Sequence, residues 1–248
     1  MATTKITSPD LFDLGSLNTA LKLPSGTTAQ RPTSPSTGEW RYNTTTKLEE
    51  YYEGRAWREL QSEDLPPTPS ENFNVVVYTG NGATQSITGV GFKPDWLAIK
   101  ERDGTNSWRV FDSTRGLTSP QTLFFNLNFA EDSESNTVSS FDADGFTMGS
   151  QQAVNDNGNT YVAYCWKANG GTTSSNTDGS ITSTVQANTK AGFSIVTYTG
   201  TGSTGTYGHG LSSAPDFIIT KKISSAESWI VWSSSLSASN YMYLNGTG

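Results

Sequence analysis

The feature that most constrains this chain is an internal repeat. The triplet Tyr78-Thr79-Gly80 recurs as Tyr198-Thr199-Gly200, 120 residues later. The dipeptide Pro94-Asp95 recurs as Pro215-Asp216, 121 residues later. A shared spacing of this length is typical of a duplicated structural unit, so the sequence predicts two copies of one domain.

Each copy consists of short alternating segments separated by glycine, proline and Asx turns. The segment WLAIK at 96–100 corresponds to FIITK at 217–221, and Trp108 corresponds to Trp229. Hydrophobic residues make up only 33% of the chain while aromatic residues reach 11%, so large rings must supply much of any core. This pattern predicts an all-β protein of tandem antiparallel β-sandwich repeats, jelly-roll-like in size and strand spacing.

The chain divides into six segments by composition. They are a docking arm (1–21), a Pro-rich connector with a three-stranded mini-domain (22–60), a Pro-rich linker (61–72), repeat one (73–167), a linker (168–192) and repeat two (193–248). Within the second linker, Ser180 to Val185 alternates and is a candidate first strand of repeat two. Repeat two reaches Gly248 soon after the counterpart of Ser113, so we expect it to be incomplete and to need strands from a longer chain.

The first segment carries apolar residues with little chain of its own to bury them. Ser8-Pro9-Asp10 has the residue types of a helix start, although Gly15 and Asn18 weaken any helix. A short helix and an extended arm both fit. In either form we expect the apolar side chains to dock on a partner; they are Leu11, Phe12, Leu14, Leu17 and Leu21.

Residues 38–60 form three short segments whose alternation predicts a β-meander. We expect its aromatic residues Trp40, Tyr42, Tyr51 and Trp57 to share one face. A meander of this size is too small to be stable alone. It must lie on something, most simply on copies of itself or on a partner.

Charge and residue counts exclude several classes of function. The net charge is −7 with no basic run, which disfavours binding to nucleic acid or to anionic membranes. Apolar runs fall far short of the roughly 20 residues of a membrane span, so we expect no membrane insertion. One cysteine and one histidine leave no intrachain disulfide and no multi-cysteine metal site, so we predict neither metal nor cofactor.

The candidate catalytic and binding residues favour structural interpretations. The Ser113–Gly116 region lacks a nucleophile-elbow motif, and His209 falls where repeat one has Val90. Asp142–Gly145 and Asn155–Asn159 resemble pieces of calcium loops, but hairpin turns explain them better. The tryptophans alternate with polar residues and fit a core, with a sugar-stacking platform as the alternative. We therefore predict a protein that is not an enzyme.

Residues 22–60 resemble a short module found in bacteriophage virion proteins. The shared pattern is GTTAQRP, then Gly38-x-x-Arg41-Tyr42-Asn43, then a Tyr52-x-Gly54-x-x-Trp57 hairpin. The paired copies, with YTGNG, a Pro-Asp turn, FDADGF and YVAYCWKA, resemble β-rich repeat domains of marine phage structural proteins.

These resemblances imply the virion-proximal part of a phage tail fibre. The implied protein is made in the host cytoplasm and becomes part of the virion tail. Its implied partners are itself as a homotrimer, tail proteins of the adaptor or nozzle type, and a host cell-surface glycan through the distal region. A head fibre or capsid decoration protein would share the modules, and a carbohydrate-binding module is an alternative from a different class.

Overall fold

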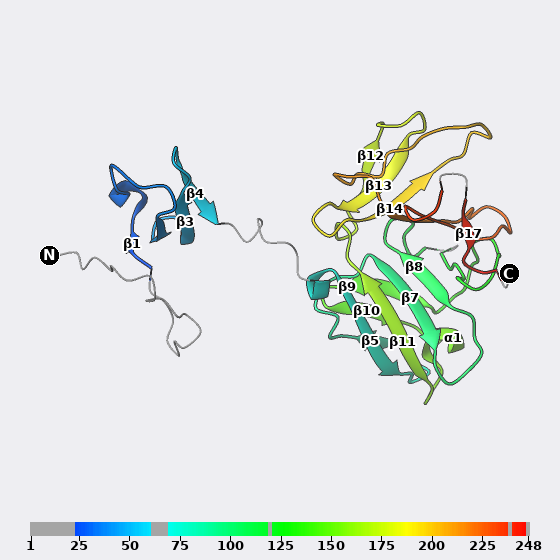
Figure 1. Cartoon of the computed structure of the whole chain (residues 1–248). Coiled ribbons are helices and arrows are strands. Elements are labelled where there is room, and N and C mark those ends of the chain that lie inside the picture. Colours follow the sequence, from blue (N-terminus) through cyan, green and yellow to red (C-terminus); the bar gives the residue numbers. More distant parts are fainter. Residues whose placement is uncertain (1–22, 61–68, 119–120, 238–239, 247–248) are drawn as a thin grey trace. The chain divides into compact units, whose positions relative to one another are not determined.

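The computed structural model describes residues 23–60, 69–118, 121–237 and 240–246. The chain divides into two compact units, Met1–Leu65 and Pro66–Gly248, and each is described by itself. Strands dominate both units (Figure 1), which confirms the predicted all-β class. Along the ranges given above, no helix is both long and apolar enough to cross a membrane.

The first unit contains the predicted meander and one further strand. Its antiparallel strands are β2 (Trp40–Asn43), β3 (Leu48–Tyr52) and β4 (Trp57–Leu60). Two connector residues form β1 (Ser25–Gly26), which pairs parallel to β2, and the 3-10 helix η2 (Thr28–Gln30) follows. The connector is therefore folded onto the sheet rather than extended away from it.

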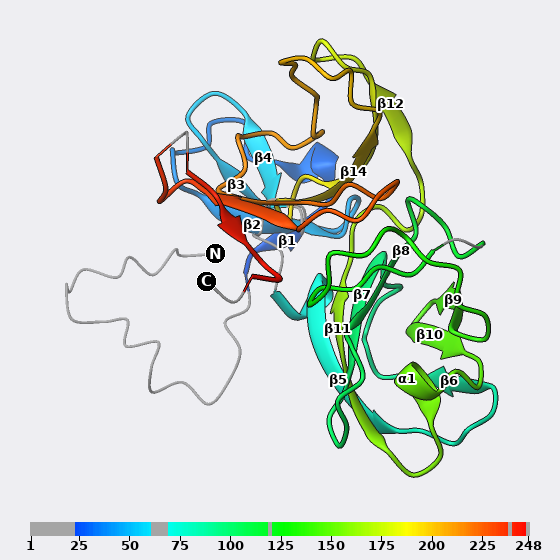
Figure 2. The ribbon, with the colours of Figure 1, turned by 90° about the vertical axis from the view of Figure 1, so that its right-hand side faces the viewer.

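Repeat one is an antiparallel β-sandwich, as predicted. Its larger sheet has the order β5-β11-β7-β8 and its smaller sheet the order β6-β10-β9, and Figure 2 shows the two sheets facing each other. The strands are β5 (Phe73–Thr79), β6 (Gln85–Ile87), β7 (Trp96–Glu101), β8 (Arg109–Asp112), β9 (Val138–Asp142), β10 (Gly145–Met148) and β11 (Thr160–Trp166). The 3-10 helix η4 (Pro69–Glu71) precedes β5, and the single turn α1 (Gln152–Asn155) precedes β11.

The core lies between these two sheets and is rich in rings. Tyr161, Phe111 and Phe146 are fully buried in it. Tyr78 stacks on Tyr161 with ring centroids 5.2 Å apart and donates a hydrogen bond to the carbonyl of Val154. Because each buried ring removes much apolar surface from water, these aromatic residues supply a large part of the core beside its aliphatic residues.

The rest of the second unit matches repeat one in the register of one strand pair. Its strands are β12 (Ser174–Asn176) and β13 (Ser183–Asn188), then within repeat two β14 (Phe193–Tyr198), β15 (Phe217–Thr220), β16 (Ile230–Ser233) and β17 (Met242–Tyr243). Trp96 pairs with Asp112 across β7 and β8, and Phe217 pairs with Ser233 across β15 and β16 at the same spacing. The structure thus supports the repeat.

The segment 168–192 does more than link the repeats. It contains the whole of β12 and the whole of β13, so two strands interrupt the predicted linker. The candidate strand at Ser180 to Val185 overlaps β13. Short polar side chains make these strands hard to recognise from the sequence. Ser183, for example, is buried and donates a hydrogen bond to the carbonyl of Gly208.

Candidate functional site

The sheet of the first unit has two faces of opposite character. Trp40 pairs with Tyr51 across β2 and β3, and Arg41 pairs with Glu50. Because side chains alternate along a strand, these pairs point to opposite sides of the sheet. The side of Trp40 is open to solvent and the side of Glu50 is covered.

The open side carries what we call the aromatic face, formed by Trp40, Tyr42 and Tyr51. Trp40 is 47% exposed and Tyr42 is 37% exposed. Trp40 and Tyr51 stack with ring centroids 5.7 Å apart and planes 27° from parallel. Two large exposed aromatic side chains on so small a unit mark this face as a candidate interaction surface.

Trp57 does not belong to the aromatic face, and this part of the prediction is wrong. It pairs with Tyr52 across β3 and β4, which places both rings on the side of Glu50. Their ring centroids are 5.6 Å apart, and the guanidinium of Arg41 lies over the Trp57 ring at 5.8 Å. The hairpin turn between Tyr52 and Trp57 sets this parity, and Gly54 in that turn has a φ of 99°.

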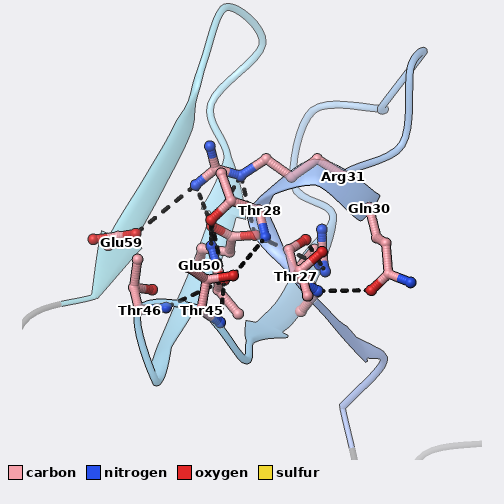
Figure 3. Close-up of polar contacts among 10 residues, drawn as sticks. Thr27, Thr28, Gln30, Arg31, Thr45, Thr46, Glu50 and Glu59 are labelled. Atoms are coloured by element: carbon pink, nitrogen blue, oxygen red, sulfur yellow. Dashed lines mark hydrogen bonds and ion pairs between the residues drawn. The ribbon is translucent and has the colours of Figure 1, made fainter.

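The covered side has a charged group at its centre, the carboxylate of Glu50, which is fully buried (Figure 3). Arg31 reaches it from the connector, with its Nη2 2.5 Å from Oε2 and its Nε 3.1 Å from the same oxygen. Asn43 donates its Nδ2 to Oε2 at 3.0 Å, and Nε of Arg41 lies 3.5 Å from Oε1. One residue of the connector and two residues of β2 thus converge on one carboxylate of β3.

The connector is folded by residues of the GTTAQRP pattern. Gln30 accepts the backbone N–H of Thr27 at 2.8 Å and closes the start of η2. The hydroxyl oxygen of Thr28 accepts a hydrogen bond from Nδ2 of Asn43 at 2.9 Å. A side chain at Gly26 would meet Nη2 of the buried Arg41, since a Cβ there would lie 2.7 Å away. Residues of this pattern therefore fold the connector over the carboxylate of Glu50.

Electrostatics favour the charged form of Glu50 despite its burial. Burial by itself raises the pKa of a carboxyl, but hydrogen bonds from Arg31 and Asn43 and the charges of Arg31 and Arg41 outweigh it. The pKa of Glu50 consequently lies below its usual range. The hydrogen bond to Glu50 raises the pKa of Arg31, and Nη2 of Arg31 also lies 3.8 Å from Glu59.

The other candidate residues have structural partners. Ser113 donates its hydroxyl to Asp95 at 2.7 Å, and Nδ1 of His209 accepts the N–H of Leu211 at 3.1 Å. Asp142 accepts the hydroxyls of Ser140 and Thr147. Over the described ranges, no group of acidic, histidine or cysteine side chains is arranged to hold a metal.

The docking-arm residues cannot be placed, because Leu11, Phe12, Leu14, Leu17 and Leu21 lie outside the described residues. Of the four predicted mini-domain residues, the structure brings three together. The residues that sequence reasoning missed are the ones around Glu50, namely Arg31, Arg41 and Asn43. The available signal was Arg41 and Asn43 alternating with aromatic residues in one strand, a pattern that predicts a polar covered face.

The second unit matches the model of one protein family, described as a domain of unknown function (DUF7483), over residues 68–248. No significant match was found among curated proteins or among solved structures. Since the family model covers most of its length, the chain belongs to the DUF7483 family.

Proposed function

We propose that this chain is a structural, non-catalytic phage virion protein, the virion-proximal part of a trimeric tail fibre. In this proposal the segment 1–21 docks on tail proteins of the adaptor or nozzle type. The first unit trimerises, and the DUF7483 repeats project outward toward a glycan on the host surface.

One observation supports self-association of the first unit in this proposal, and the trimer follows from the resemblance to tail fibres. Within residues 23–60 the fully buried side chains are polar, while Trp40 and Tyr42 are exposed. The charged side of this sheet is covered and its aromatic side is in contact with water. Exposed aromatic side chains of this kind are the ones that an interface between copies of the chain would bury. The resemblance of residues 22–60 to phage virion modules supports the setting.

The aromatic face can be tested by changing Trp40→Ala and Tyr42→Ala together in the full chain. Neither side chain belongs to the network around Glu50, so the change removes only the surface that a partner would cover. We expect the unchanged protein to sediment as a trimer at micromolar concentration and the double variant to sediment as a monomer. Unchanged hydrogen exchange of the β5 and β11 amides would show that the second unit of the variant is folded.

A matched control is Val77→Ala, because Val77 is also exposed, at 60%, but lies in the second unit. This variant should remain a trimer. A monomeric unchanged protein, or a double variant that remains trimeric, would overturn the proposed interface.

A further inference from the structure

The aromatic face of the first unit carries hydrogen-bond donors that are not used within the unit. Within the described parts of the chain, the indole N–H of Trp40 and the hydroxyls of Tyr42 and Tyr51 have no hydrogen-bond partner. Trp40 and Tyr51 stack on neighbouring strands, so these donors lie beside the faces of large rings. A ligand that fits this face supplies hydrogen-bond acceptors and flat apolar groups.

The opposite side of the same unit presents a short proline-rich segment with the sequence Pro-Thr-Ser-Pro, which we call the PTSP segment (residues 32–35). Arg31, the residue before it, reaches Glu50 on the side of the sheet away from the aromatic face (Figure 3). The first three residues of the segment are exposed. Its four backbone carbonyls accept no hydrogen bond from the described residues, and its two prolines have no N–H.

The aromatic face and the PTSP segment are therefore complementary in chemistry. Proline-rich segments bind surfaces lined with aromatic side chains, because proline rings pack on aromatic rings and free carbonyls accept hydrogen bonds from indole and hydroxyl groups. Within one copy the sheet lies between the two surfaces, since Glu50 and Tyr51 are neighbours in β3 and point to opposite sides. The contact consequently needs a second copy of the chain.

Three-fold symmetry calls for a pair of surfaces of this kind. A surface that packs against itself makes a two-fold dimer, whereas a ring of three copies joins two different surfaces of each copy. The first unit has one such surface on each side of its sheet, the aromatic face and the PTSP segment. A front-to-back contact between neighbouring copies uses both of them.

We propose that the aromatic face of each first unit binds the PTSP segment of a neighbouring copy of the chain. This inference rests on the trimer of the proposed function and adds the surface that meets the aromatic face. The rings of Trp40 and Tyr42 pack on the prolines of the neighbour, and the indole and hydroxyl groups donate to its free carbonyls. Three such contacts close the ring.

The first test is cross-linking in the full chain, with Ser34→Cys in one variant and Glu49→Cys in another. Glu49 is exposed and pairs with Tyr42 across β2 and β3, so it lies on the aromatic face. The native Cys165 is buried, and the unchanged chain is the control for its reaction. We expect a short bismaleimide to join the two engineered cysteines when the variants are co-expressed, as identified by mass spectrometry, and to cross-link neither variant alone.

A matched pair of variants tests the contact without a cross-linker. Thr33→Arg adds a bulky charge to the PTSP segment, and Thr46→Arg makes the same change in the exposed turn between β2 and β3. By sedimentation, Thr33→Arg should raise the concentration needed for the trimer at least tenfold, and Thr46→Arg should leave it unchanged.

Equal trimer stability of the two arginine variants would overturn the inference. So would cross-links between Glu49→Cys chains alone, which indicate face-to-face packing, or the absence of cross-links between the two cysteine variants. Any of these results, obtained on a trimer, leaves the proposed function standing. An unchanged chain that sediments as a monomer would overturn both.

Discussion

At the scale of single residues, the first unit is organised by a buried charge. Glu50 is fully buried and is contacted by Arg31, Arg41 and Asn43. Nη1 of Arg41 is buried without a hydrogen-bond partner, so the network is not fully satisfied. A buried ion pair adds little over a well-packed apolar pair, but losing one partner is costly, because it leaves the other charge buried.

We therefore predict that Glu50→Gln destabilises the first unit by about 2 kcal/mol. Breaking a fully buried pair costs roughly 3–5 kcal/mol, and the effect here is smaller because Arg31 keeps contact with water. The measurement is hydrogen exchange of the β2–β4 amides in the full chain. Glu49→Gln is the control, since Glu49 is an exposed neighbour in the same strand, and it should change exchange little.

The same variant has a defined pH signature. Because the pKa of Glu50 is lower in the folded unit than in the unfolded chain, its stabilising effect is complete above the unfolded pKa. The effect is lost as the pH falls below about 4.3 through the folded value. Protection of β2–β4 should thus fall with acid in the unchanged chain and fall less in Glu50→Gln. Parallel acid profiles for the two proteins would contradict this assignment.

At the scale of secondary-structure elements, the buried amide of Gln186 makes several of the hydrogen bonds that join β13 to the first repeat. Oε1 of Gln186 accepts a hydrogen bond from the N–H of Gly171 at 2.7 Å. Its Nε2 donates hydrogen bonds to the hydroxyls of Ser113 and Thr114, each at 2.9 Å. Asp95 lies beside this contact and accepts the N–H of Ala168 at 2.7 Å. These bonds join the end of repeat one to the start of repeat two.

Gln186→Ala should weaken this junction by about 2 kcal/mol, because it leaves the N–H of Gly171 without this partner and removes the hydrogen bonds to the hydroxyls of Ser113 and Thr114. The measurement is faster hydrogen exchange of the β13 and β14 amides. Thr184→Ala is the control on the same strand, since Thr184 is exposed and its loss should change stability by no more than about 0.5 kcal/mol. Equal effects of the two variants would contradict the junction.

Elements with strong local patterns could be predicted from the sequence, and those held by distant polar contacts could not. Strands β7 and β8 follow from apolar segments bounded by turns. The side on which Trp57 lies depends on parity across a turn, and β1 is only two residues long and pairs through its backbone. The network around Glu50 joins Arg31 to a strand 19 residues away, which no local periodicity reports.

At the scale of the whole molecule, the two units bury different kinds of side chain. The buried hydrophobic residues of the described chain all lie in the second unit, whereas the first unit buries polar groups. The second unit therefore has the means to fold by its own apolar core. On the proposed function, the first unit gains apolar burial by trimerisation through the aromatic face, and the segment 1–21 gains it by docking.

These two associations use different residues, so they should be separable. We predict that deleting residues 1–21 leaves a trimer in solution that no longer joins the virion. Deleting only residues 1–7 is the matched control, because it keeps the apolar residues from Leu11 to Leu21 and should preserve incorporation. The measurement is the copy number of each variant per purified particle, with labelled chains located by electron microscopy. Label on the tail would support the tail-fibre assignment and label on the head would replace it with a head fibre, while full incorporation of the longer deletion would refute docking by this segment.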